Sequence, residues 1–454
     1  MTTTWSTTSG IAERAYAIAK AGSLKEALDN GSIGKIIDVS LSEALVLGLL
    51  KQGVRTYFAI FGHGSTDIAD VLRIYDEEGV THTINCRNEV EMAHAATALR
   101  WTYGETPAVI TSIGPGALQS MAASLAAVSN GIGVYHIYGD ETTWGEGYNM
   151  QQAPKSQQGI FGRMTADLSQ SYVLHTPEAL RDALRRGAQC VFHPAKAAPF
   201  FLMLPINTQP QKVTVNLAAL PEKPSSAIVG SCQLERLRDA ADLIAGASKI
   251  VIKAGGGTRG HDAAIRRLAE ASGAVVALSP GSLGVLAEND PRNMHVGGSK
   301  GSISGNYAMT EADLLIVIGS RAVCQADCSG IGYKNAKHVI NINYDLTDAQ
   351  HYNHTTALVG DIPLVANDLS ALLEASNTGK TPAKSAWFKA CVEKKREWRA
   401  FRDQRLQTEV IMDEVWKRPA LTQPVAIKAV ADFAKTKGAI KYFDAGDVQA
   451  NGFQ

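Results

Sequence analysis

The chain has 454 residues, too many for one ordinary hydrophobic core, so about two or three domains are expected. Its 44 basic and 44 acidic residues give a formal net charge of zero, which argues against a nucleic-acid interface. No apolar run reaches the ~18 residues that a membrane span needs, and the N-terminus lacks the features of a secretion signal. Six thinly spread cysteines do not suggest a disulfide framework, so we expect a cytoplasmic globular protein.

Helix and strand patterns alternate after a polar, partly helical lead-in over residues 1–35. Apolar segments typical of strands occur at 56–62, 80–86, 107–114, 133–139 and 197–207, and segments typical of helices occur at 42–54, 91–104 and 117–131. This alternation is the signature of an open parallel sheet with helices on both faces. It predicts a first α/β domain over residues 36–208.

The alternation restarts twice. A proline-bearing polar linker at 209–228 precedes a second predicted α/β domain at 229–375, and a linker with a charged helix follows at 376–425. Residues 426–454 begin a third unit, in which a helical pattern is followed by an expected strand in "AIKYFDAGD". One strand buries too little apolar surface to fold alone. The predicted fold class is therefore α/β, with two doubly wound parallel-sheet domains in tandem and the start of a third.

Three glycine turns follow predicted strands of the first domain: "FGHGS" at 61–65, "SIGPGA" at 112–117 and "YGDET" at 138–142. Ligands of open α/β sheets bind at the carboxyl ends of strands, and glycine turns there expose backbone N–H groups. Each turn by itself is equally well explained as a structural feature. His63, in the first turn, is either an acid/base group or a solvated loop residue.

The stretch "NCRNEVEMAHAATALRW" places Glu89 and Glu91 at the start of an expected helix. Asn88 suits the N-cap position, and Glu91 would then complete a capping box. A glutamate in the first turn also interacts favourably with the helix dipole. From these residues alone, a structural role for Glu89 and a catalytic one are both open.

Two other patterns give little evidence for a nucleotide-binding or metal site. "KAGGGTRG" at 253–260 lacks the spacing of a dinucleotide fingerprint. Cys324 and Cys328 have the spacing CxxxC, but no second Cys/His pair completes a zinc site. We therefore expect no metal site within this chain.

The order of the motifs is more specific than any one of them. "VRTYFAIFGHG", "NEVEMAHAATALRW" and "VITSIGPGALQSMAASLAAV" together resemble the pyrimidine-binding domain of thiamine-diphosphate enzymes, in the branch of acetolactate synthase and pyruvate oxidase. "AIFGHGS" and "EMAHAA" look most like the trihydroxycyclohexanedione hydrolases. The resemblance continues through "KIVIKAGGGTRG", "ADLLIVIGSR" and "HVININYD", and covers about residues 38 to 454.

This resemblance implies a role for Glu89. In the family, the glutamate of this motif hydrogen-bonds N1′ of the cofactor's aminopyrimidine and favours the imino tautomer, which removes the thiazolium C2 proton and generates a nucleophilic ylide. A carboxyl group in a water-poor site can share a proton with a ring nitrogen in this way. Glu91 falls where relatives usually have a small residue, so no chemistry is assigned to it.

The resemblance also implies a lining for the site. His63 is expected to orient the substrate, and the two glycine turns to lie against the aminopyrimidine. The cofactor-binding residues expected in these turns and the following helix are Gly62, Gly64, Ser112, Gly114, Pro115, Gly116 and Gln119. Gln157 and Gln158 match, in a loose register, a glutamine near the reaction centre.

The family's GDG motif, which holds Mg²⁺ and the diphosphate, has no counterpart in this sequence. "FDAGDVQANG" resembles only the first loop of the diphosphate-binding domain, where Asp444, Ala445 and Gly446 would meet the diphosphate. Asp447 replaces a residue that is often polar and neutral in relatives. Either a separate subunit supplies the rest of the domain or the sequence is a fragment. We favour a separate subunit, in a heterotetramer or a multiple of it.

The resemblance implies thiamine diphosphate and Mg²⁺, shared with a partner chain, as cofactors. The middle domain binds FAD in acetolactate synthase and pyruvate oxidase, and the sequence permits FAD without requiring it. The expected reaction cleaves or forms a C–C bond next to the carbonyl of a small 2-keto acid or 1,2-dione. The alternatives are a catalytically silent binding or regulatory homologue, and an FAD- or NAD-binding oxidoreductase.

Overall fold

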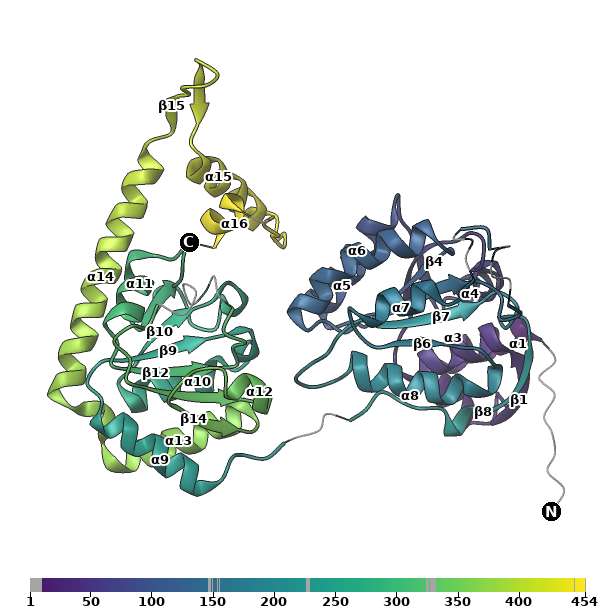
Figure 1. The fold of residues 1–454 in the computed structure, drawn as a ribbon, viewed down its shortest axis with the longest axis horizontal. Coiled ribbons are helices and arrows are strands. Elements are labelled where there is room, and N and C mark those ends of the chain that lie inside the picture. Colours follow the sequence, from purple (N-terminus) through teal and green to yellow (C-terminus); the bar gives the residue numbers. More distant parts are fainter. Residues whose placement is uncertain are drawn as a thin grey trace. The chain divides into compact units, whose positions relative to one another are not determined.

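A computed structural model describes residues 10–145, 148, 150–152, 154, 156–225, 229–323, 326, 332–444 and 446–453. The chain divides into two compact units, one within residues 1–227 and the other within residues 228–454. In each unit, helices lie on both sides of a central parallel sheet (Figure 1).

The first unit is built from alternating strands and helices. Its strands are β1 (Ile36–Ser40), β2 (Thr56–Ile60), β3 (His82–Asn85), β4 (Ala108–Thr111), β5 (Tyr135–Asp140), β6 (Ser171–Val173), β7 (Phe200–Pro205) and β8 (Lys212–Asn216). Its α-helices are α1 (Ile11–Ala21), α2 (Leu24–Asp29), α3 (Leu41–Lys51), α4 (Thr66–Glu77), α5 (Glu89–Tyr103), α6 (Pro115–Asn130), α7 (Ile160–Ala166) and α8 (Leu180–Val191).

Six of these strands form a parallel sheet in the order β3-β2-β4-β5-β7-β6. Because successive side chains of a strand point to opposite faces, Tyr57 and Ala59 belong to the core with α1, α3, α4 and α8, whereas Phe58 packs with α5. The chain runs from β2 outward to β3 and then crosses back to β4. The topological switch point, where open α/β sheets bind ligands, therefore lies between β2 and β4.

The described parts of the lead-in and of the expected linker, residues 10–35 and 209–225, belong to this unit. Helix α1 is held by Arg14, whose guanidinium forms a bidentate, buried ion pair with Glu43 of α3, with N–O distances of 2.7 and 2.6 Å. The Tyr75 hydroxyl also donates to Glu43, at 3.0 Å. Residues 212–216, within the expected linker, form β8 and pair antiparallel with β1. The polar alternation of "KVTVN" is that of an edge strand exposed on one face.

The second unit repeats the architecture. Its strands are β9 (Ile250–Ala254), β10 (Val275–Leu278), β11 (Asn293–Val296), β12 (Leu314–Ile318), β13 (His338–Asn343), β14 (Thr355–Val359), β15 (Val410–Met412) and β16 (Pro419–Leu421). Its α-helices are α9 (Leu234–Gly246), α10 (Asp262–Ser272), α11 (Ile303–Glu311), α12 (Leu346–Ala349), α13 (Ile362–Ser376), α14 (Pro382–Gln407), α15 (Gln423–Thr436) and α16 (Asp447–Gly452).

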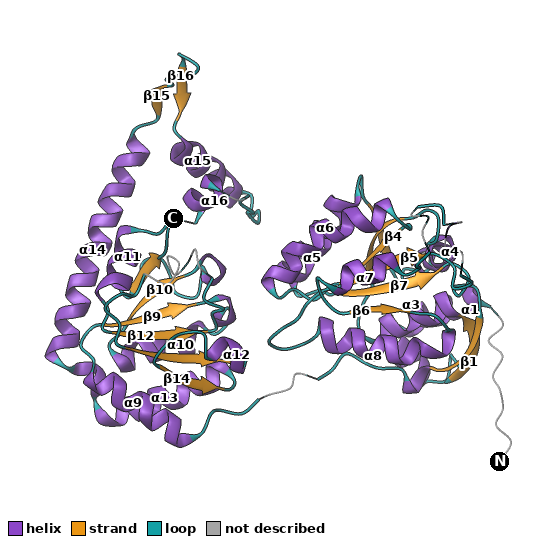
Figure 2. Ribbon diagram, in the orientation of Figure 1, coloured by secondary structure: helices purple, strands orange, loops and turns teal. Residues whose placement is uncertain are grey.

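The second sheet is also parallel, in the order β11-β10-β9-β12-β13-β14. Alternate side chains of β9 again belong to two cores: Ile250 and Ile252 pack with α9, α10 and α13, whereas Val251 packs with α11 and α14. Figure 2 shows the helices and strands of this unit. The indole N–H of Trp387 donates to the backbone oxygen of Ile250 at 3.0 Å and ties α14 to the sheet. The expected fold class of two doubly wound parallel-sheet domains is confirmed.

The C-terminal segment differs from the expectation in one element. Beyond α14 the chain forms the antiparallel hairpin β15–β16, then α15 and α16. The predicted strand at 439–447 is wrong: residues 439–444 are irregular, and α16 begins at Asp447. A strand forms only when a neighbouring strand satisfies its backbone groups, and the described residues place none beside this segment. Among the described helices, none is both long and apolar enough to cross a membrane.

Candidate functional site

The three glycine turns of the first unit interlock, because β2, β4 and β5 are neighbours in the sheet. A Cβ atom added to Gly62 would lie 3.1 Å from the Ser112 Cβ, and one added to Gly64 would lie 2.3 Å from the Ile113 Cγ1. A Cβ at Gly139 would lie 2.6 Å from the Gly64 oxygen. Glycine at these positions lets the three loops approach one another closely at the carboxyl edge of the sheet.

Hydrogen bonds fix the first of these turns. The Ile113 N–H donates to the His63 oxygen at 3.0 Å, and the buried Gln209 side chain donates to the Gly64 oxygen at 2.6 Å. The Gly62 N–H donates to the Ser65 hydroxyl at 3.1 Å. The His63 backbone is therefore held in place while its side chain is exposed.

The two glutamates at the start of α5 have different environments. The Glu91 N–H donates to the Asn88 side chain at 2.9 Å, which is one half of the expected capping box. The Glu91 side chain is exposed, and the Glu89 side chain is half-buried. Asn88 thus carries out the capping, and Glu89 is not needed for it.

The Glu89 carboxylate lies over the second glycine turn. A Cβ added to Gly116 would lie 2.9 Å from Glu89 Oε1 and 3.0 Å from the Ser112 hydroxyl oxygen. Gly116 has an ordinary negative φ, so the backbone does not require glycine there. A methyl group at this position would meet both oxygen atoms, so the Glu89 and Ser112 side chains would have to rotate away. This contact joins the start of α5 to the start of α6 at the switch point of the sheet.

The contacts described above do not involve the predicted glutamines. Gln119 and Gln157 are exposed, as is Pro115, whereas Gln158 donates to the Thr142 oxygen at 2.9 Å within its own loop. Gln152 lies against the glycine turn instead. A Cβ added to Gly114 would lie 2.5 Å from the Gln152 Cγ, and Gly114 also has a positive φ of 76°.

Two residues of the site were therefore missed. Gln152 belongs to the same glutamine-rich loop as Gln157 and Gln158, but the sequence offers no way to choose among them. Asp140 ends β5 in the "YGDET" turn, and burial raises its pKa from its ordinary value to about 6, against the opposing effect of the Glu141 N–H that donates to it at 3.0 Å. An aspartate that ends a buried strand beside a glycine turn was the signal that could have identified it.

The residues expected to meet a diphosphate lie in the second unit. Asp444 is exposed, and Gly446 caps α16 with a positive φ of 84°. Ala445 lies outside the described residues. Asp447 forms an ion pair with Lys300, which lowers the pKa of the Asp447 carboxyl. The lysine thereby offsets the negative charge that Asp447 introduces at this position.

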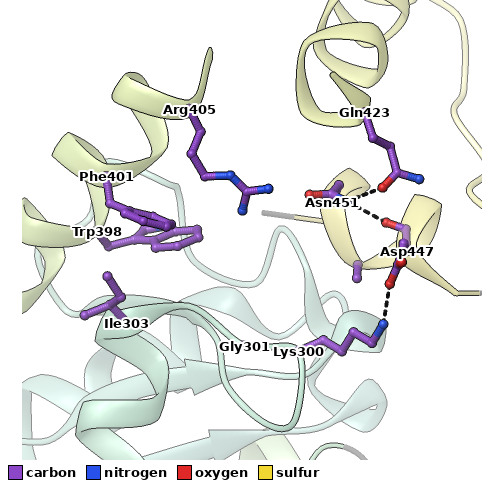
Figure 3. Close-up of a pocket in the computed structure, with 10 residues that line it drawn as sticks. Lys300, Gly301, Ile303, Trp398, Phe401, Arg405, Gln423, Asp447 and Asn451 are labelled. Carbon is purple, nitrogen blue, oxygen red and sulfur yellow. Dashed lines mark hydrogen bonds and ion pairs between the residues drawn. The ribbon is translucent and has the colours of Figure 1, made fainter. Parts of the chain in front are cut away.

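A pocket of about 460 Å³ opens beside this ion pair. Trp398 and Phe401 of α14 form one side, and Asn451, which donates to the Gln423 side chain at 2.9 Å, lies on the other (Figure 3). The remaining lining residues are Lys300, Gly301, Ile303, Arg405, Asp447 and Ala450. Its polar side chains are largely paired with one another.

The glycine turn of the middle domain has a packing role. A Cβ added to Gly255 would lie 2.3 Å from the Gly319 oxygen, and one added to Gly257 would lie 3.0 Å from the Gly319 Cα. These glycines allow the loops after β9 and β12 to touch. Across the described part of the chain, no three His, Cys, Asp or Glu side chains are grouped as a metal site. Cys324 and Cys328 lie outside the described residues.

Comparisons with known proteins match both units. The model of the thiamine pyrophosphate enzyme N-terminal TPP binding domain matches residues 39–160, which include Glu89 and the glycine turns. The model of the thiamine pyrophosphate enzyme central domain matches residues 237–369.

Curated relatives share low identity over most of the chain. The probable acetolactate synthase large subunit of Methanocaldococcus jannaschii is 26 % identical over 361 residues, which cover 78 % of this chain and 59 % of that protein. The 3D-(3,5/4)-trihydroxycyclohexane-1,2-dione hydrolase of Clostridium perfringens is 24 % identical over 405 residues, 87 % of this chain and 61 % of that protein. The corresponding hydrolase of Bacillus licheniformis is 26 % identical over 402 residues, 82 % of this chain and 60 % of that protein.

The chain spans about three fifths of the length of these relatives. The two matched domains occur in one chain and in the expected order, and both groups of relatives are those that the motifs indicated. The expected resemblance is confirmed. The chain belongs to the thiamine pyrophosphate enzyme family, of which it carries the N-terminal and central domains.

Proposed function

We propose that this chain is part of a thiamine-diphosphate-dependent enzyme that cleaves or forms a C–C bond next to a carbonyl group. The observation that carries the proposal is the position of the Glu89 carboxylate, against the side-chain-free Gly116 at the switch point of the first sheet. Relatives named for acetolactate synthesis and for dione hydrolysis support a small 2-keto acid or 1,2-dione as substrate.

The residues present fit an aminopyrimidine ring. Gly116 leaves the Glu89 carboxylate uncovered on the side of the turn, and the half-buried carboxylate suits a ring nitrogen that shares its proton. When bound, thiamine diphosphate supplies a nucleophilic carbon for attack on the substrate carbonyl. The role of Glu89 is to hold a proton at N1′ of the ring, while the α5 cap remains with Asn88.

Two further groups act on the substrate side in this proposal. His63 has a fixed backbone and an exposed side chain, so it can orient a carbonyl without reorganising the turn. Asp140 has a pKa of about 6 because of burial, which allows it to carry a proton near neutral pH. Both residues flank the contact between Gly64 and Gly139.

The proposal requires further polypeptide to complete the diphosphate-binding domain. Helix α15 has no buried residue, and its Val430 and Phe433 side chains are 68 and 64 % exposed. Apolar side chains exposed together on one helix support a surface that another chain segment covers. We favour a separate subunit, which would bring the ligands of Mg²⁺ and the diphosphate and assemble as two copies of each chain or a multiple of that.

Calorimetry with thiamine diphosphate and Mg²⁺ tests the proposal. The isolated chain should show no tight binding, because the ionic contacts to Mg²⁺ and the diphosphate supply most of the affinity. The complex co-purified with the product of the adjacent gene should bind the cofactor. Micromolar, Mg²⁺-dependent binding by the isolated chain would show that no partner is needed. A complex that binds no cofactor would instead favour a catalytically silent homologue.

A further inference from the structure

The loop after β5 places one polar side chain against the turn that carries Glu89. Gln152 packs over Gly114, whose added Cβ would lie 2.5 Å from the Gln152 Cγ and 3.1 Å from its Cβ. Gly114 and Gly116 belong to the same turn, so Gln152 and Glu89 contact it at positions two residues apart. The turn thus carries two side chains with acceptor oxygens, from different loops.

The carbonyl oxygen of the Gln152 side chain receives no hydrogen bond from the described residues. This Oε1 atom is buried. A buried carbonyl oxygen without a donor costs free energy, and such an atom in a native structure calls for an explanation. The other glutamines here serve the fold, since Gln158 binds the Thr142 oxygen and Gln209 binds the Gly64 oxygen.

The chemistry of the aminopyrimidine ring indicates which group could donate a hydrogen bond to the Gln152 oxygen. In the proposed function, on which this inference rests, Glu89 engages N1′ of the aminopyrimidine. The remaining hydrogen-bond donor of that ring is its exocyclic amino group, and a carboxamide oxygen is a suitable acceptor for it. We infer that Gln152 is a positioning residue of the aminopyrimidine site, whose side-chain oxygen accepts a hydrogen bond from the exocyclic amino group.

A cofactor-positioning role and a purely structural role of Gln152 predict different results for one variant. Gln152→Met keeps the length of the side chain and removes only the oxygen that lacks a partner. Thermal unfolding of the isolated variant chain should therefore occur at the wild-type temperature or above it. The complex with the completing subunit should bind thiamine diphosphate about five- to tenfold more weakly, as expected for one lost hydrogen bond. Gln152→Glu retains an acceptor oxygen and should recover most of that affinity.

Gln52→Met is the matched control, at the C-cap of α3. It removes bonds to the Leu184 and Pro221 oxygens, so it should lower the unfolding temperature and leave cofactor affinity within twofold of wild type. The inference is overturned if Gln152→Met binds the cofactor as tightly as wild type, or if it loses stability and affinity together. If the wild-type complex binds no thiamine diphosphate, the proposed function itself fails. Binding by wild type with no effect of Gln152→Met refutes the inference alone.

Discussion

The turn cluster of the first unit, at residues 61–65, 112–117 and 138–142, contrasts with the C-terminal segment at residues 408–453. In the turn cluster, loops from neighbouring strands interlock at contacts that only glycine permits, and Glu89 and Gln152 lie on them. In the C-terminal segment, α15 buries no residue and the Asp447 carboxylate is paired with Lys300. The first region is therefore packed by contacts within its own domain, whereas the apolar side chains of α15 are exposed.

The largest effect is expected from Glu89→Gln, which should preserve the fold because Asn88 provides the helix cap. A neutral amide cannot share the N1′ proton, so activity of the completed enzyme should fall on the order of 10²–10⁴-fold. Exchange of the cofactor C2 proton for deuterium, followed by quenched NMR, measures the step directly. Glu91→Gln is the control and should cost little. Equal exchange in wild type and Glu89→Gln, or slower exchange in Glu91→Gln, would contradict the assignment.

Asp140→Asn should stabilise the fold at neutral pH, because burial disfavours the charged form of Asp140. The folded-state pKa of Asp140 is raised to about 6, so its protonated form stabilises the fold at low pH and this contribution is lost as the pH rises through about 6. The asparagine variant should therefore be more stable than wild type at pH 7, on the order of 2–3 kcal/mol, and equally stable below pH 4. Urea unfolding at several pH values gives the comparison. A difference that does not change with pH would show that ionisation of Asp140 is not responsible.

Gly116→Ala should displace the Glu89 carboxylate from the second glycine turn. The added methyl group would meet Glu89 Oε1 and the Ser112 hydroxyl at about 3 Å, and because both side chains can rotate away, the expected destabilisation is only about 1 kcal/mol. The displaced carboxylate should also slow C2 proton exchange in the completed enzyme. Gly246→Ala is the control, because its Cβ meets no atom within 4 Å. Unchanged stability and exchange in Gly116→Ala would mean that the carboxylate does not lie over the turn.

The smallest effect is expected from Phe433→Ser in the C-terminal segment. This side chain is 64 % exposed in α15, so its loss should not destabilise the isolated chain. It should weaken association with the completing subunit about tenfold, as loss of an apolar anchor does. Leu234→Ser in α9 removes another exposed apolar side chain and should leave association unchanged. Sedimentation of the mixed chains measures both, and equal dissociation constants for the two variants would place the interface elsewhere.

Much of the fold could be predicted because it depends on local patterns. Strand–helix alternation identified the central strands of both sheets, and Asn88 was recognised as the α5 cap from its type and position. Residues 212–216 were assigned to a linker because β1, the strand with which they pair, lies near the other end of the domain in the sequence. The strand expected at 439–447 is not formed, because an apolar segment forms a strand only where a neighbouring strand pairs with it.

By itself, the sequence determined the fold class, the three glycine turns and the motif that singles out Glu89, since each is encoded by residues close together in the chain. Only the tertiary structure decided that the Glu89 carboxylate lies against Gly116, and that Gln152, and not Gln157 or Gln158, covers Gly114. It also decided that α15 has an uncovered apolar face. The first two features are contacts between loops that β-strand pairing brings together, and the third depends on which segments pack against α15. No local pattern of residue types specifies which atoms then meet.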